Sequence, residues 1–186
     1  MASSLWLVRH GETAWSLSGQ HTSTTDLPLT EEGERKAAAV GKALAGKKFS
    51  AIFSSPMRRA RDTCRIAGVG DPIITDDLRE WNYGSYEGLT TAQIQESAPG
   101  WTIWTGVAPG GETIKQVAER ARRVIREAPE GAVTIFGHGH MLRVLAACWL
   151  ETSPEMGRCF ALGTGSISIL GYERDSRVIQ TWNQAN

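Results

Sequence analysis

The sequence predicts an α/β fold: a three-layer αβα sandwich with a mostly parallel central sheet and a short cap over the carboxyl ends of its strands. Short apolar runs alternate with longer amphipathic segments, the pattern of a sheet covered by helices on both faces. Two of the runs, at residues 5–8 and 133–136, end beside a histidine-containing motif. The 186 residues are enough for one domain that spans the whole chain, 1–186.

The first elements follow from local signals. Residues 5–8 are a predicted buried strand, and the polar residues 9–29 are a predicted loop. Thr30 is the predicted N-cap of a helix, because two glutamates follow it where the helix dipole favours negative charge. The spacing of apolar and small residues places one side of this helix on the core: Ala37, Val40, Gly41 and Leu44.

Two more strands and a helix are expected in the first half of the chain. Residues 51–53 are a predicted strand. Pro56 is predicted in the first turn of a helix that runs to about residue 66, because proline lacks the N–H that a first turn leaves unpaired. Residues 72–74 begin with a proline, which suits an edge strand.

A cap and the rest of the sheet are expected in the second half. Residues 78–111 are rich in glycine and aromatic side chains and are predicted to cover the strand tips: Trp81, Tyr83, Tyr86, Trp101 and Trp104. Whether these aromatics pack or shape the substrate is left open. Two helices and three strands complete the prediction, at 112–127, 133–136, 141–150, 166–172 and 178–182.

The amino-acid composition argues against several classes of function. The 20 lysines and arginines balance 20 aspartates and glutamates, so no broad basic surface for nucleic acid is expected. Three cysteines do not make a disulfide framework and suit a reducing compartment. The apolar run before Arg9 is too short for a membrane span or signal peptide. We expect a cytoplasmic protein with no nucleic-acid or membrane partner; homo-oligomerisation is left open.

The two histidine motifs indicate phosphoryl chemistry. Ligands of α/β sheets bind at the carboxyl ends of the strands, where His10 and His138 are expected. A neutral imidazole can attack phosphorus and form a covalent intermediate that water later cleaves. The planar guanidinium groups of Arg9 and Arg59 can each donate two parallel hydrogen bonds to phosphate oxygens. Their positive charge lowers the pKa of His10. The expected partner is a small phosphorylated metabolite.

Glu80 is the candidate general acid, because the leaving alkoxide needs a proton and the charge of bound phosphate favours the protonated carboxyl group. The same group could later activate water. No cofactor is required, since arginines supply the positive charge. A metal site at His138 and His140 is not expected, because alternate residues of a strand point to opposite faces and no Cys or Asp cluster accompanies them.

These residues resemble the histidine phosphatase superfamily, in its phosphoglycerate-mutase-like branch, over nearly the whole chain. The motifs that carry the resemblance occur in order: Arg9-His10-Gly11-Glu12-Thr13, Leu27-Pro28-Leu29-Thr30 with Gly33, Ser54-Ser55-Pro56 through Arg59-Ala60 and Thr63, Glu80 with Tyr83-Gly84 and Glu87-Gly88, Gly110-Gly111-Glu112, and His138-Gly139.

The resemblance implies roles for these positions. His10 is implied as the phosphorylated nucleophile and Glu80 as the proton donor. Three side chains are implied to bind phosphate and stabilise the transition state: Arg9, Arg59 and His138. Four further positions match residues that line the substrate site: Ser16, Thr22, Ser23 and Gly139.

Three departures from the mutase pattern favour hydrolysis. The segment between Glu80 and His138 is short, Ser23 stands where mutases carry glycine, and His140 stands where they usually carry asparagine. The pattern is closer to sedoheptulose-bisphosphatase-like and broad acid phosphatase members. We therefore predict a phosphomonoesterase for small sugar phosphates or bisphosphates. The alternatives are a cofactor-dependent phosphoglycerate mutase, a phosphoprotein phosphatase and a non-catalytic phosphate-ester binding module. His140 is expected to begin a helix, near the substrate or in a structural role.

Overall fold

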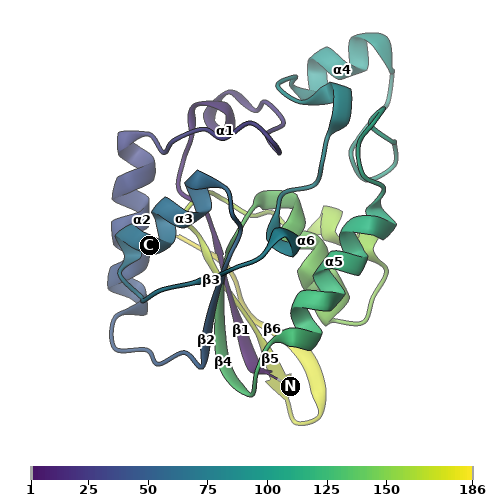
Figure 1. The fold of residues 1–186 in the computed structure, drawn as a ribbon. Coiled ribbons are helices and arrows are strands. Elements are labelled where there is room, and N and C mark those ends of the chain that lie inside the picture. Colours follow the sequence, from purple (N-terminus) through teal and green to yellow (C-terminus); the bar gives the residue numbers. More distant parts are fainter. Residues whose placement is uncertain (1, 186) are drawn as a thin grey trace.

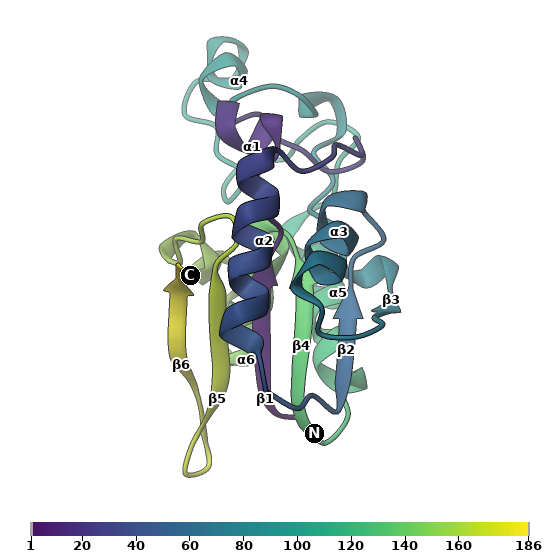
Figure 2. The ribbon, with the colours of Figure 1, turned by 90° about the vertical axis from the view of Figure 1, so that its left-hand side faces the viewer.

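The computed structural model describes residues 2–185 and has the predicted three-layer α/β architecture (Figures 1 and 2). A six-stranded sheet has the order β3-β2-β4-β1-β5-β6. Its strands are Ala2–Arg9 (β1), Ala51–Ser54 (β2), Ile73–Ile74 (β3), Gly131–Gly137 (β4), Ile167–Glu173 (β5) and Ser176–Gln184 (β6). Strands β1 to β4 pair in parallel, whereas β5 pairs antiparallel with both of its neighbours, β1 and β6. The sheet is thus mostly parallel, as predicted.

Helices cover both faces of the sheet (Figure 1). On one face lie α2 (Glu31–Leu44) and α3 (Arg58–Ala67), and on the other lie α5 (Ile114–Glu127) and α6 (Gly139–Trp149). The shorter helical segments are α1 (Ala14–Ser18), α4 (Thr91–Ser97), η1 (Asp76–Leu78), η2 (Gly84–Tyr86) and η3 (Pro154–Cys159). Helices α1 and α4 stand above the carboxyl ends of the parallel strands (Figure 2). Residues 78–111, which contain α4, therefore lie on the side of the sheet where the cap was expected.

The register between β1 and β4 brings the two histidine motifs together. Leu5 pairs with Val133 and Arg9 with Gly137, so both strands end at the same level. The apolar runs of both strands are buried between helices, as parallel strands require. His10 and His138 consequently leave the sheet side by side.

The predicted Thr30 cap and edge strand are confirmed, whereas the predicted helix start at Pro56 is wrong. The Thr30 hydroxyl accepts a hydrogen bond from the N–H of Gly33 at 3.0 Å and caps α2. Ile73–Ile74 is an edge strand. Pro56 is not in the first turn of a helix, since α3 begins at Arg58 after the N-cap Met57. The Ser55 hydroxyl accepts the N–H of Met57, so Pro56 lies in a turn between β2 and α3.

The 9–29 stretch is not wholly a loop, because it contains α1. The hydroxyl of Thr13 accepts the N–H of Ser16, and the hydroxyl of Ser16 accepts the N–H of Thr13. This reciprocal cap uses serine where glutamate or glutamine is usual, so the sequence signal was weak. A helix of five residues is also too short to show a hydrophobic period.

Helix α6 begins at Gly139, two residues earlier than predicted. His138 is its N-cap and His140 lies in its first turn, as a helix-starting residue. The expectation that His138 and His140 would alternate along a strand is therefore wrong, because the strand ends at Gly137. An early helix start aims backbone N–H groups of α6 at the strand tips.

Two glycines let α2 lie against the segment that carries His10. A Cβ on Gly33 would come within 2.1 Å of the Glu12 carbonyl oxygen, and a Cβ on Gly11 within 2.3 Å of the Gly33 carbonyl oxygen. Both contacts are to backbone, which cannot rotate away. The absence of side chains at both positions sets how closely α2 approaches the end of β1.

We expect Gly33→Ala to lower the free energy of unfolding by about 1–3 kcal/mol, because a methyl group there must push α2 away from Glu12. Arg35→Ala is the matched control on the exposed side of α2, with an expected change within about 0.5 kcal/mol. Urea unfolding of both variants measures the difference. Equal stability of the two would show that α2 can move at no cost.

Candidate active site

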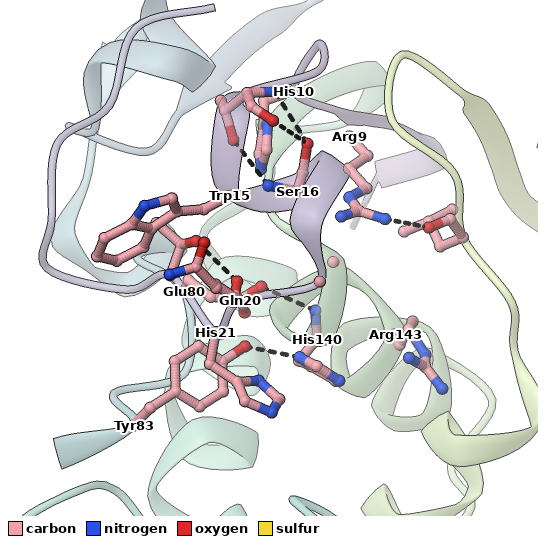
Figure 3. Close-up of a pocket in the computed structure, with 15 residues that line it drawn as sticks. Arg9, His10, Trp15, Ser16, Gln20, His21, Glu80, Tyr83, His140 and Arg143 are labelled. Carbon is pink, nitrogen blue, oxygen red and sulfur yellow. Dashed lines mark hydrogen bonds between the residues drawn. The ribbon is translucent and has the colours of Figure 1, made fainter. Parts of the chain in front are cut away.

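A cavity of about 160 Å³ opens at the carboxyl ends of β1 and β4 (Figure 3). Its wall includes six of the predicted site residues: Arg9, His10, Ser16, Thr22, Glu80 and Gly139. Pockets for drug-sized ligands have volumes of roughly 300–1,000 Å³. The cavity therefore suits a small polar ligand.

His10 presents an unprotonated nitrogen. Its Nδ1 lies 2.7 Å from the carbonyl oxygen of Gly11, which can only accept a hydrogen bond, so Nδ1 carries the ring proton. The pKa of His10 is held well below its ordinary value by burial, and further by the charges of Arg59 and Arg9. The ring is thus neutral near pH 7, with Nε2 as a nucleophile.

Arg9 has a buried donor without an acceptor. Its Nη1 donates to the carbonyl oxygen of Leu162, whereas Nε has no hydrogen-bond partner among residues 2–185. A buried N–H without a partner is costly, and more so when the group is charged. Arg9 also lines the cavity. Its positive charge therefore favours an anion in the cavity.

Arg59 and His138 lie behind His10, outside the cavity wall. Arg59 Nε donates to His138 Nδ1 at 3.1 Å, so the ring proton of His138 is on Nε2, which donates to the Ser55 hydroxyl at 2.7 Å. The ring centroids of His10 and His138 are 5.2 Å apart. Burial, Arg59, His10 and Arg9, in decreasing order, lower the pKa of His138 well below its ordinary value. Direct contact of Arg59 and His138 with phosphate stays a prediction.

Arg59 also fixes the loop that closes one side of the cavity. Its Nη1 donates to the carbonyl oxygen of Thr25 at 3.0 Å, and its Nη2 donates to those of Thr22 and Ser23 at 3.3 and 3.2 Å. The carboxylate of Glu87 accepts N–H groups from Ser23 and Thr25 on the same loop. The positive charge of Arg59 thus holds carbonyl oxygens of residues 22–25, and the negative charge of Glu87 holds N–H groups of the same loop.

Glu80 is tied to the start of α6. Its Oε1 accepts the N–H of Met141 at 2.8 Å and that of Trp81 at 2.9 Å, and its Oε2 accepts the N–H of His140 at 3.0 Å. The N-cap residue His138 supplies no side-chain cap, so Glu80 binds first-turn N–H groups in its place. In Figure 3 the carboxyl group lies between His10 and the pair Tyr83–His140. The nucleophile and the candidate acid share one cavity.

The remaining predicted residues have different surroundings. The Ser16 hydroxyl caps α1, and the Thr22 hydroxyl donates to the carbonyl oxygen of Gln20. Ser23 is buried against Glu87, to which its hydroxyl donates, and it is not in the cavity wall. A Cβ on Gly139 would lie 3.3 Å from the Arg9 guanidinium carbon, so this glycine leaves room for Arg9.

Arg143 and Tyr83 also line the cavity, and the sequence did not single them out as site residues. The Tyr83 hydroxyl lies 2.6 Å from His140 Nδ1. Arg143 lies over the Trp104 ring, 4.6 Å from its centroid, and donates to the carbonyl oxygens of Gly157 and Arg158 at 3.0 and 3.1 Å. No carboxylate within residues 2–185 forms a salt bridge with Arg143. Its position one turn after Gly139 on a helix that begins at the site was the signal that could have identified it.

His140 and the cap aromatics combine packing with proximity to the cavity. His140 lines the cavity, contacts Tyr83 and packs edge-on against Trp104. Its pKa is well below its ordinary value because of burial, Arg143, His21 and Arg9, in decreasing order. Trp81 and Trp101 are buried in the main core cluster, so most of the aromatic cap packs while Tyr83 faces the cavity.

Among the residues that the structure describes, no three His, Cys, Asp or Glu side chains are grouped so that they could hold a metal ion. Nor does this part of the chain contain a helix of the length and apolarity needed to cross a membrane.

The order and geometry of the site agree with a known family. Residues 5–185 match the family model of the histidine phosphatase superfamily, branch 1. The chain belongs to this superfamily. The predicted resemblance is confirmed over nearly its whole length.

Relatives of this histidine phosphatase include enzymes named as phosphatases. An acid phosphatase of Mycobacterium tuberculosis is 41% identical over 93% of this chain and 88% of that protein. Sedoheptulose 1,7-bisphosphatase of Saccharomyces cerevisiae is 36% identical over 89% of this chain and 86% of that protein. The solved structure of the Mycobacterium tuberculosis open reading frame Rv3214 has a TM-score of 0.94 at 38% identity, over 100% of this chain and 99% of that chain. Phosphoglycerate mutases are also among the relatives.

The buried histidines predict how stability depends on pH. The folded-state pKa values of His10, His138 and His140 are lowered, so the unfolded chain binds protons more readily than the folded chain. The free energy of unfolding should be undiminished above pH of about 6.5 and fall below it, by up to about 1.4 kcal/mol per pH unit for each histidine. Urea unfolding from pH 8 to 5 measures this slope.

The matched variant is His10→Asn, which removes one of the four histidines with a lowered pKa, His21 being the fourth. Below a pH of about 6.5, the free energy of unfolding of this variant should fall less steeply with pH, by the contribution of one histidine. A slope equal to that of the unaltered protein would contradict the lowered pKa of His10.

Proposed function

We propose that this histidine phosphatase is a phosphomonoesterase that hydrolyses small sugar phosphates or bisphosphates through a phosphohistidine on His10. The observation that carries the proposal is the neutral His10 ring, whose Nδ1 proton is held by the Gly11 carbonyl while Nε2 is left unprotonated. Arg9 lines the same cavity, and its guanidinium group is the proposed anion-binding donor. The similarity to an acid phosphatase and to a sedoheptulose 1,7-bisphosphatase supports this substrate class.

In the first step, Nε2 of His10 forms a bond to phosphorus and the bond between phosphorus and the ester oxygen breaks. Arg9 faces the phosphoryl oxygens, where charge develops in the transition state. Glu80 gives its proton to the departing alkoxide, which leaves as an alcohol.

In the second step, water attacks the phosphohistidine and Glu80 takes the proton that water loses. The P–N bond breaks, inorganic phosphate leaves, and His10 regains its neutral form. Glu80 is again protonated, so the cycle is closed with one water consumed.

Phosphoglycerate mutation is the alternative chemistry of the same pocket. A mutase must keep water from the phosphohistidine and retain a bisphosphate that primes it. The short segment between Glu80 and His138 favours hydrolysis. A cytoplasmic location and a small phosphorylated metabolite as partner stay predictions from the sequence, which also left homo-oligomerisation open.

His10→Ala should lower the rate of phosphate release by about 10⁴-fold or more, because it removes the imidazole that attacks phosphorus in the proposed reaction. The assay is phosphate release from sugar bisphosphates, sugar monophosphates, phosphoglycerates and a phosphotyrosine peptide. Rapid quenching should trap an acid-labile phosphoenzyme in the unaltered protein and none in His10→Ala. Full activity of His10→Ala would sink the proposal, whereas isomerisation of phosphoglycerate faster than its hydrolysis would favour the mutase.

Arg143→Met should raise the KM for a sugar bisphosphate by about tenfold and change that for the corresponding monophosphate less, because Arg143 is a second cation in the cavity without an acidic partner. Arg143→Lys keeps the charge but loses the planar fork, and an intermediate KM is expected. Steady-state kinetics of each variant with both substrates measures the ratio of the two KM values. Equal changes for both substrates would show that Arg143 does not face a second anionic group.

A further inference from the structure

The candidate acid Glu80 lies on a segment without regular secondary structure. Residues 79–83 lie between η1 and η2 and belong to neither a helix nor a strand. Backbone carbonyls in such a segment have no ladder partners and need other donors. The position of Glu80 therefore depends on contacts from elsewhere in the chain.

Arg120 of α5 supplies those donors. Its Nη1 donates to the carbonyl oxygens of Asp77 and Arg79 at 2.8 and 2.9 Å, and its Nη2 reaches the carbonyl oxygen of Glu80 itself at 3.5 Å. One guanidinium thus spans the turn that leads into the candidate acid. The guanidinium group is planar and its donor directions are fixed, so it can hold these carbonyl oxygens in place as a clamp.

Glu112 holds Arg120 and also the other end of the segment. Arg120 donates to both carboxylate oxygens of Glu112, from Nε and Nη2, at 2.8 Å each. The same carboxylate accepts the N–H of Asn82 at 2.9 Å, and the Glu112 carbonyl oxygen accepts the indole N–H of Trp81 at 2.8 Å. The two side chains together contact the backbone on both sides of Glu80.

This pair borders a second cavity, not the active-site cavity. The second cavity is lined by Glu80, Asn82, Glu112 and Arg120, so Glu80 lines both cavities. On one side it is held by the N–H groups of His140 and Met141. Without the clamp on the other side, the segment has open space into which it can shift.

We propose that the Arg120–Glu112 ion pair is the positioning device that orients Glu80 for proton transfer to the leaving group. This inference rests on the proposed function, in which Glu80 is the acid. Neither Arg120 nor Glu112 lines the active-site cavity, so both act through the backbone of residues 77–82. Their geometry is bidentate, and the two side chains are only 12% and 22% exposed, unlike the open ion pairs of α2 and α3.

The leaving group distinguishes positioning of an acid from a general structural role. Nitrophenolate leaves without protonation, whereas a sugar or glycerol alkoxide needs a proton from the acid. The quantity kcat/KM covers the steps up to loss of the leaving group, so it excludes hydrolysis of phosphohistidine, which is common to both substrates. A misplaced acid therefore lowers kcat/KM for the alkyl ester and spares that for the aryl ester.

The experiment compares kcat/KM for 4-nitrophenyl phosphate and glycerol phosphate in Arg120→Met, Arg120→Lys and Glu80→Gln. For Arg120→Met we expect a loss of about 100-fold with glycerol phosphate and of less than about fivefold with 4-nitrophenyl phosphate. Glu80→Gln should show the same selectivity, and Arg120→Lys should recover part of the loss.

Arg123→Met is the matched control. Arg123 also reaches from α5 to η1, but it binds the carboxylate of Asp77 and no backbone near Glu80. This variant should keep both activities. If Arg120→Met does not fold, as judged by circular dichroism and thermal unfolding, Glu112→Gln is measured in its place, since it removes the ion pair and retains the side-chain shape.

Two results would overturn the inference. Equal losses with both esters would mean that the pair is only structural, and unchanged kcat/KM with glycerol phosphate would mean that Glu80 needs no clamp. A Glu80→Gln variant with no leaving-group selectivity would instead remove the acid role of Glu80 from the proposed function. The failure of each proposal is thus seen in a different variant.

Discussion

The parallel pairing of β1 with β4 is the constraint on which the site depends. With Arg9 opposite Gly137, the N–H of His10 donates to the Gly137 carbonyl oxygen at 3.0 Å, and the strands end together. This register places His138 behind His10 and starts α6 beside both. A register shift would separate the two imidazoles and move the first-turn N–H groups of α6 away from Glu80.

The site concentrates buried cations around a neutral histidine. Burial lowers the pKa of His10, and the charges of Arg59 and Arg9 lower it further. Arg59 is compensated by three backbone carbonyls, whereas Arg9 keeps an unpartnered Nε. The positive charges favour an anionic ligand in the cavity, as the proposed function requires.

The candidate nucleophile and the candidate acid are held in different ways. His10 follows a central strand, so the backbone ladder determines its place. Glu80 lies in an irregular segment, and its place is determined by N–H groups of α6 on one side and by Arg120 with Glu112 on the other. Changes in the cap or in α5 should therefore affect proton transfer more than nucleophilic attack, since they leave the β1–β4 ladder intact.

The sequence alone determined the α/β class, the strand segments and the Thr30 cap, because apolar runs and capping residues are local signals, and its Arg9-His10 motif indicated the candidate nucleophile. Tertiary structure alone decided the short helix α1, the early start of α6, the burial of Ser23 against Glu87, the lining role of Arg143 and the clamp on Glu80. Each of these rests on contacts between residues far apart in the chain or on a helix too short to show a hydrophobic pattern. The pattern of residues in a segment shows which of its faces is buried in the core. Which distant side chains contact that face is decided only by how the segments pack.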